Sequence, residues 1–193
     1  MTVPELPSAP PEFQRAVASL HAARPRPEVR VRETGAPQRL APFAVALAAD
    51  VDGDPAADGV LASGRLVVLH DPSGQEGWGG RTRLVAYGSA DLDAEIVADP
   101  VLPAVGWAWL TEAWQGRGAT ATAEAGTVTR VTSEHFGGLA ERAPAASLEV
   151  RASWTPLGDD LGPHLLAWTD LLAALAGLPP LTPGVTALPS VPR

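Results

Sequence analysis

Strict alternation of apolar and polar residues between positions 146 and 154 constrains the fold of this chain more than any other feature. The even positions are apolar: Ala146, Leu148, Val150, Ala152 and Trp154. The odd positions are polar: Ser147, Glu149, Arg151 and Ser153. Successive side chains on a β-strand point to opposite faces of its sheet. The segment is therefore predicted to be a strand of an antiparallel sheet, with one face buried and one solvated.

Five further strands are predicted. Residues 43–51 alternate large side chains with the methyl groups of Ala44, Ala46 and Ala48, so we expect a helix or another backbone to approach this methyl face closely. The remaining strands are expected at 28–33, as an exposed edge, and at 60–70, 81–90 and 128–136.

Apolar residues at steps of three and four predict three helices. The first lies between Pro11 and Arg24, the second spans about 104–114, and the third begins at Gly162-Pro163 and ends before Gly177. The chain order is then α-ββββ-α-ββ-α. This order predicts an α+β protein, in which an antiparallel β-sheet has helices packed mainly on one face.

The chain has 193 residues, a length that suits a single domain with a sizeable core. We expect this domain to span 11–180, after a flexible N-terminal segment at 1–10 and before a C-terminal tail at 181–193. No apolar stretch is long enough to span a membrane. Because no export signal is recognisable at the N-terminus, a cytoplasmic protein is expected.

Composition excludes several kinds of chemistry. All fourteen basic residues are Arg, and Lys and Cys are absent. The chain therefore lacks a thiolate nucleophile, Cys-ligated metal, a Schiff-base Lys and a Walker-type phosphate loop. The net charge is −8 and the pI is about 4.9, which argues against nucleic acid as a partner.

The segment at 69–80, Leu-His-Asp-Pro-Ser-Gly-Gln-Glu-Gly-Trp-Gly-Gly, is the candidate functional loop. Loops held between strands commonly carry binding groups. The residues that we single out for ligand or partner binding are His70, Asp71, Gln75, Glu76 and Trp78. A purely structural interpretation also accounts for much of the segment, because Asp71-Pro-Ser-Gly is typical of a type I turn.

No catalytic residue, metal ligand or cofactor is assigned. His21, His135 and His164 are not spaced as metal-ligand pairs with one another or with His70. No GxSxG nucleophile motif occurs.

Several strings of this sequence are distinctive together: 26–29, 36–47, 69–80, 126–131, 136–139 and 151–157. They resemble the actinobacterial DUF3000 family, a domain of unknown function. The resemblance covers nearly the whole chain and implies a cytoplasmic protein of a high-GC actinobacterium. It implies no activity, cofactor or catalytic residue.

Three functional hypotheses follow. The first is a non-enzymatic cytoplasmic module that binds a protein or a small molecule through the 70–80 loop and one sheet face. The alternative is a small hydrolase or isomerase with a His/carboxylate site around His70, Asp71 and Glu76. A third hypothesis, from element order alone, is a homodimeric domain similar to small secretion chaperones that hold a client chain.

Overall fold

The computed structural model describes residues 9–53 and 59–181. Its helices are α1 (Pro11–Ala22), α2 (Ala94–Ala98), α3 (Leu102–Arg117) and α4 (Gly162–Leu175), with a 3₁₀ turn η1 at Gly137–Leu139. Its strands are β1 (Val29–Thr34), β2 (Phe43–Asp52), β3 (Val60–His70), β4 (Thr82–Asp91), β5 (Ala121–Ser133) and β6 (Ala145–Pro156). The expected terminal segments at 1–10 and 181–193 lie almost wholly outside the described residues.

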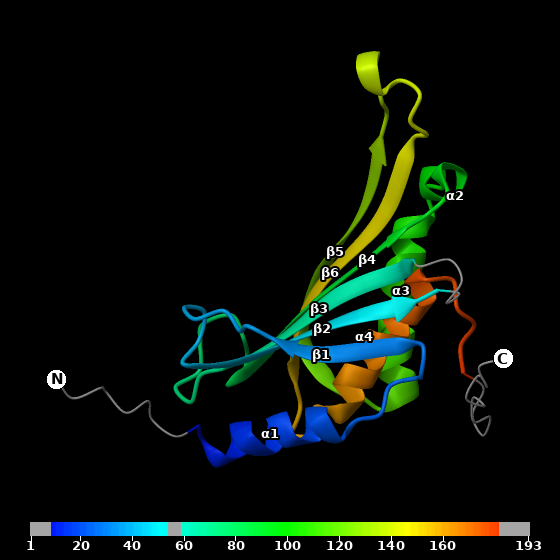
Figure 1. The fold of residues 1–193 in the computed structure, drawn as a ribbon. Helices are drawn as coiled ribbons and strands as arrows, with labels where there is room; N and C mark the ends of the chain where they lie inside the picture. The colour runs from blue at the N-terminus through cyan, green and yellow to red at the C-terminus, as the bar shows by residue number, and fades with distance from the viewer. Residues whose placement is uncertain (1–8, 54–58, 182–193) are drawn as a thin grey trace.

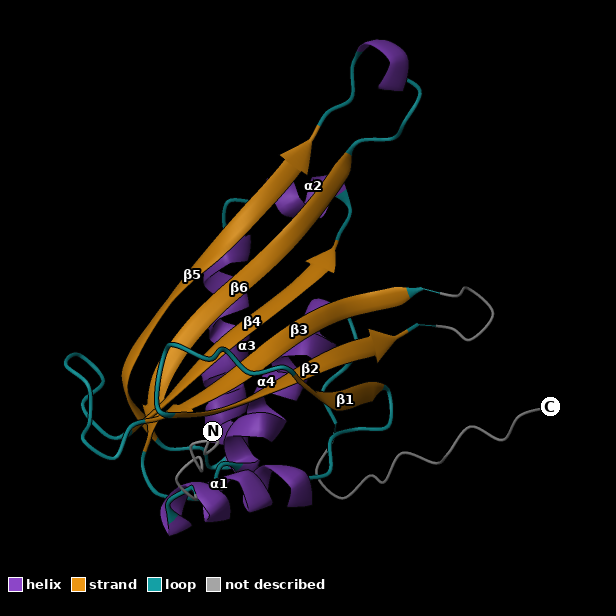
Figure 2. Ribbon diagram, turned by 60° about the vertical axis from the view of Figure 1, so that its left-hand side comes forward, coloured by secondary structure: helices purple, strands orange, loops and turns teal. Residues whose placement is uncertain are grey.

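The six strands form one antiparallel sheet in the order β1-β2-β3-β4-β6-β5. β5 and β6 extend past the other strands as a long two-stranded arm, which ends in the η1 turn (Figure 1). The helices lie on one side of the sheet (Figure 2). The prediction of an α+β protein with helices on one face of an antiparallel sheet is confirmed.

The core lies between the sheet and the helices. Trp154 of β6 and Trp168 of α4 are fully buried there, and Leu66 and Leu84 lie beneath them on neighbouring strands. The predicted alternation in β6 is confirmed, because all of its even positions from 146 to 154 are buried.

Two glycines allow α4 to lie close to the sheet. Gly64 and Gly88 are directly opposite each other on β3 and β4. A Cβ atom at Gly64 would lie 2.7 Å from a methyl carbon of Leu172, and one at Gly88 would lie 2.9 Å from the same carbon. Larger side chains at this pair would push the helix away from the sheet.

The helix ends follow local signals. Pro11, Pro103 and Pro163 lie in the first turns of α1, α3 and α4, where a missing N–H costs no helical hydrogen bond. Gly118 ends α3 in the left-handed conformation, with φ of 67°, and Gly177 follows α4 with φ of 72°.

Some predicted boundaries were wrong. The helix expected at 104–114 spans Leu102–Arg117, so Gly116 lies inside it, and the short helix α2 was not predicted. β5 begins earlier than 128 and ends at Ser133, before η1. The short α2 lacks the repeated apolar spacing from which a helix is recognised in a sequence.

The methyl face of β2 lies on the side of the sheet away from the helices. The loop at 35–42, between β1 and β2, crosses the sheet on this side (Figure 2). Ala46 is completely buried there. The methyl face is therefore on the side of the sheet that this loop crosses, and its close approach to another backbone stays a prediction.

Candidate functional site

His70 ends β3 and points into the protein. Its side chain is 2% exposed, and its ring stacks on Phe13 of α1, with 5.5 Å between the ring centroids. Nδ1 lies 2.9 Å from the hydroxyl oxygen of Thr82. Burial lowers the pKa of His70, and the carboxylate of Glu12 partly opposes this shift. The neutral imidazole is thus favoured inside the protein.

The Nε2 atom of His70 is buried without a hydrogen-bond partner. Oε1 of Glu12 lies 3.8 Å from it, which is beyond hydrogen-bonding distance. Among the described residues, no hydrogen bond or ion pair joins His70 to Asp71 or Glu76. The three groups of the hydrolase hypothesis are therefore not connected as an acid–base relay.

Asp71 and Gln75 do lie together in the loop. The backbone N–H of Gly74 donates to the carbonyl of Asp71 at 2.9 Å, which closes the predicted turn. The carboxylate of Asp71 also accepts from the N–H of Ser73 at 2.9 Å and from the side-chain amide of Gln75 at 3.2 Å. These bonds give the loop a defined shape.

Gln75 joins this loop to the one that crosses the sheet. Its amide donates to the carbonyl of Leu40 at 3.1 Å. The side chain of Leu40 is itself 57% exposed. The two loops therefore form a continuous rim at one end of the sheet.

Glu76 and Trp78 occupy the second half of the loop. Glu76 is exposed, whereas Trp78 is half-buried. The carbonyl of Trp78 accepts a hydrogen bond from the hydroxyl of Thr155 on β6. This contact anchors the loop to the end of the sheet and leaves the carboxylate of Glu76 in solvent.

The sheet face opposite the helices forms the second part of the candidate site. Gly64, Gly88 and Gly126 face the helices, so their neighbours along each strand point the other way. We define the open face by the following exposed or half-buried residues: Ser63, Arg65, Val85, Tyr87, Ser89, Thr127, Thr129, Glu149, Arg151 and Ser153.

A row of cationic and aromatic groups crosses the centre of the open face. Arg65, Tyr87 and Arg151 are direct neighbours on β3, β4 and β6. The guanidinium carbon of Arg151 lies 5.0 Å from the ring centroid of Tyr87, within the range of a cation–π interaction. Arg151 also pairs with Glu149, whereas Arg65 donates to the carbonyl of Gly35 at 2.6 Å. Both arginines are exposed.

Arg83 lies on the same side of the sheet, near the 70–80 loop, but it is only 9% exposed. Its guanidinium donates to the carbonyl of Ala123 at 2.8 Å and to the hydroxyls of Ser153 and Thr155 at 2.7 and 3.2 Å. Burial lowers the pKa of Arg83, and the carboxylate of Glu124 partly opposes this. Arg83 of β4 therefore links the irregular part of β5 at Ala123 to Ser153 and Thr155 of β6.

Two cavities lie away from the 70–80 loop. One of about 360 Å³ lies between α1 and β1, lined by Leu20, Val29 and Leu47 among others, with the His21–Glu33 pair at 3.3 Å beside it. Another of about 480 Å³ lies by α2 and the start of α3. None of the five predicted loop residues lines either cavity.

The described residues contain no cluster of three or more His, Asp or Glu side chains placed to hold a metal ion. Within the same residues, no helix is long and apolar enough to cross a membrane.

The sequence did not single out Tyr87, Arg65 or Arg83 as binding residues; Val85 and Tyr87 were expected to pack in the core with Leu84, but they lie on the open face. Arg151 was expected on a solvated face, but its neighbours across the sheet depend on strand order and register. The alternation of side chains in β4 could have indicated Tyr87. Leu84 is fully buried, and Val85 and Tyr87 are one and three residues after it, so they point to the opposite face of the sheet.

The fold and the site together define an α+β protein with a half-covered antiparallel sheet. The family model described as "Protein of unknown function (DUF3000)" matches residues 9–186, so the chain belongs to the DUF3000 family. Comparison with curated proteins and with solved structures finds no match.

Proposed function

We propose that the protein is a non-enzymatic binding module whose partner lies on the open face, beside the rim formed by the 70–80 and 35–42 loops. The observation that carries this proposal is the row of Arg65, Tyr87 and Arg151 on a sheet face without a covering helix. Here two guanidinium groups flank an aromatic ring in solvent, an arrangement that is typical of interaction surfaces.

The chemistry of the row favours carboxylate groups on the partner. Guanidinium groups form bidentate hydrogen bonds with carboxylates, and Arg65 lacks a carboxylate partner among the described residues. The exposed side chain of Val85, two residues before Tyr87, adds an apolar contact. An acidic protein segment with an apolar residue fits this surface.

The rim loops support the same proposal. Asp71, Gln75 and the Leu40 carbonyl are joined by hydrogen bonds, so the rim is shaped before a partner arrives. A preformed surface loses less conformational entropy on binding than a loose one. The side chains of Leu40, Glu76 and Trp78 are at least partly accessible there.

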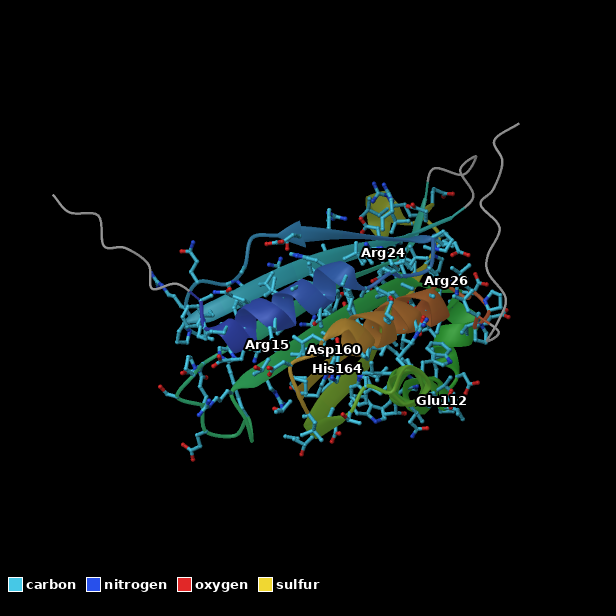
Figure 3. All side chains as sticks on the ribbon, turned by 90° about the horizontal axis from the view of Figure 1, so that it is seen from below. Arg15, Arg24, Arg26, Glu112, Asp160 and His164 are labelled. Atoms are coloured by element: carbon cyan, nitrogen blue, oxygen red, sulfur yellow. The ribbon has the colours of Figure 1, made fainter. Side chains whose placement is uncertain are left out.

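Site-specific photocrosslinking tests the proposal. A photoreactive amino acid is placed at Val85 on the open face and, as a control, at Glu112 on α3, which lies on the helical side (Figure 3). After irradiation in an extract of the native cell, we expect a discrete adduct with another protein from position 85 and none from position 112.

Matched arginine variants sharpen the test. Arg65→Gln with Arg151→Gln should abolish the adduct, whereas Arg24→Gln, after α1 on the helical side, should leave it intact (Figure 3). Adducts that form equally from positions 85 and 112, or that persist in the double variant, would overturn the proposal.

A further inference from the structure

The two edges of the sheet are protected to very different degrees. β1 forms one edge, has six residues and carries three charged side chains. Its Arg30 and Arg32 pair with Asp52 and Asp50 of β2, and its Glu33 pairs with His21 of α1. Short, charged edge strands resist pairing with another strand.

β5 forms the opposite edge and has thirteen residues. In the described part of the chain, only β6 pairs with it. We define its regular part, residues 125–133, as the free edge. Its sequence, Ala-Gly-Thr-Val-Thr-Arg-Val-Thr-Ser, is rich in β-branched residues and contains one charge. Such a strand has the composition that favours pairing with a further strand.

The free edge is bounded on its N-terminal side by a β-bulge. The register with β6 shifts between Thr122 and Ala125, and Ala123 adopts a φ of 52°. Arg83 holds this bulge through the Ala123 carbonyl. Because the bulge interrupts regular pairing, the length available to another strand begins at Ala125.

Exposed apolar side chains lie beyond both ends of the free edge. Phe136 and Leu139, at the tip of the arm, are 76% and 46% exposed. Leu157 is 59% exposed and lies at the other end, where its N–H donates to the carbonyl of Thr120 at 2.9 Å. Three large apolar groups thus stand in solvent at opposite ends of one edge.

We propose that two copies of this chain pair β5 with β5 in antiparallel fashion about a two-fold axis near Thr129. This axis uses the whole free edge, with Thr129 opposite Thr129 and Val131 opposite Thr127 of the second copy. Arg130 then lies opposite Val128, so the one charge of each edge does not face its equivalent.

The same two-fold axis brings unlike ends of the two edges together. In an antiparallel pair, the arm tip of one copy, with Phe136 and Leu139, lies at the end of the pairing where the β-bulge and Leu157 of the other copy lie. A second copy thus places exposed apolar groups of both chains at each end of the joined edges.

Dimerisation would also enlarge the open face. Identical edge strands that pair in antiparallel fashion are related by an axis perpendicular to the sheet, so both open faces point to the same side. Two six-stranded sheets would become one continuous sheet. The dimer itself does not depend on the proposed binding function.

The absence of cysteine from the chain makes a sharp experiment available. Thr129→Cys, Thr127→Cys and Arg32→Cys are prepared separately and oxidised, and the products are separated without reductant. Residues directly opposite on antiparallel strands are near enough for a disulfide. We expect a covalent dimer from Thr129→Cys, much less from Thr127→Cys, and none from Arg32→Cys on the protected edge.

Mass measurement by light scattering complements the crosslinking. The wild-type protein in solution should have twice the mass of one chain, which is 19.9 kDa. Thr129→Lys with Val131→Lys should restore the monomer, whereas Thr34→Lys on β1 should leave the dimer intact. Circular dichroism checks that each variant is folded.

A wild-type monomer at high concentration would overturn the proposal and leave the free edge to a strand of another protein. A dimer that ignores the two lysines and forms no disulfide at position 129 would also overturn it, since another surface would then hold the copies together. If the dimer forms but position 85 gives no photocrosslinked adduct, the result counts against the proposed binding function and not against the dimer.

Discussion

The two faces of this sheet are built from the same strands, but one is apolar and buried and the other is polar and solvated. On the covered face, Leu66, Leu84, Leu148 and Trp154 are all completely buried against the helices. On the open face, Arg65, Tyr87 and Arg151 lie directly opposite one another and remain at least partly in solvent. Burial of apolar area stabilises the fold, and solvated side chains contribute little to it. The covered face therefore holds the fold together, and the open face is free to serve binding.

The largest expected difference comes from Trp168 on the covered side. It is fully buried, and its Nε1–H donates to the carbonyl of Tyr87 at 3.0 Å. Trp168→Ala should lower the free energy of unfolding by about 3–5 kcal/mol, because it leaves a large cavity. Urea denaturation measures this, with Trp168→Phe as a milder variant for the case in which alanine prevents folding. A loss below about 1 kcal/mol would contradict the assignment of the core to this face.

The next effect depends on pH and concerns His164 of α4. His164 is buried, and its Nδ1 accepts a hydrogen bond from Nε1 of Trp154 at 3.0 Å; it lies near Asp160 at the start of α4 (Figure 3). Burial lowers the pKa of His164 to about 4 from an ordinary value of 6.5, and Asp160 opposes part of the shift. The unfolded chain therefore binds more protons between these two pH values.

Stability from His164 is thus complete above pH 6.5 and declines as the pH falls toward 4. The loss reaches about 3 kcal/mol, which is the free energy of that pKa difference. Denaturation of the wild type and of His164→Gln at several pH values measures it. The wild type should lose stability faster than the variant over this range, and parallel curves would contradict the prediction.

Arg83 is an exception on the open side of the sheet, because its side chain is buried. Arg83→Met should cost about 1–3 kcal/mol, because the carbonyl of Ala123 and two hydroxyls lose their buried donor. The matched variant Arg65→Met, at an exposed arginine of the same face, should change the free energy of unfolding by less than about 0.5 kcal/mol. An equal loss of unfolding free energy in the two variants would contradict the distinction between the buried Arg83 and the exposed Arg65.

The smallest effects are expected at the small polar residues of the open face. Ser89→Ala and Thr127→Ala should each change the free energy of unfolding by less than about 0.5 kcal/mol, because neither side chain forms a hydrogen bond with another of the described residues. Thermal or urea unfolding checks this. A loss above 2 kcal/mol at either position, on the order expected for core truncation, would mean that this face is structural as well.

Within the 70–80 loop, the sequence predicted the backbone better than the side chains. The turn at Asp71 forms as expected, because Asp, Pro and Gly fix it through local geometry. The direction of His70 could not be foreseen. It depends on Phe13, more than fifty positions earlier in the chain, whose ring stacks on the imidazole. The role of the loop in binding stays a prediction.

The sequence by itself determined the α+β class, the alternation of β6, the end of α4 before Gly177, and the membership of the DUF3000 family. The alternation of β6 and the end of α4 depend on neighbours a few residues apart, so local stereochemistry is sufficient for them, whereas the class and the family follow from patterns along the whole chain. Tertiary structure alone decided that Tyr87 lies between two arginines, that Gly64 lies opposite Gly88, and that β5 is left at an edge. Each of these depends on strand order and register, which are set by the packing of segments far apart in the chain.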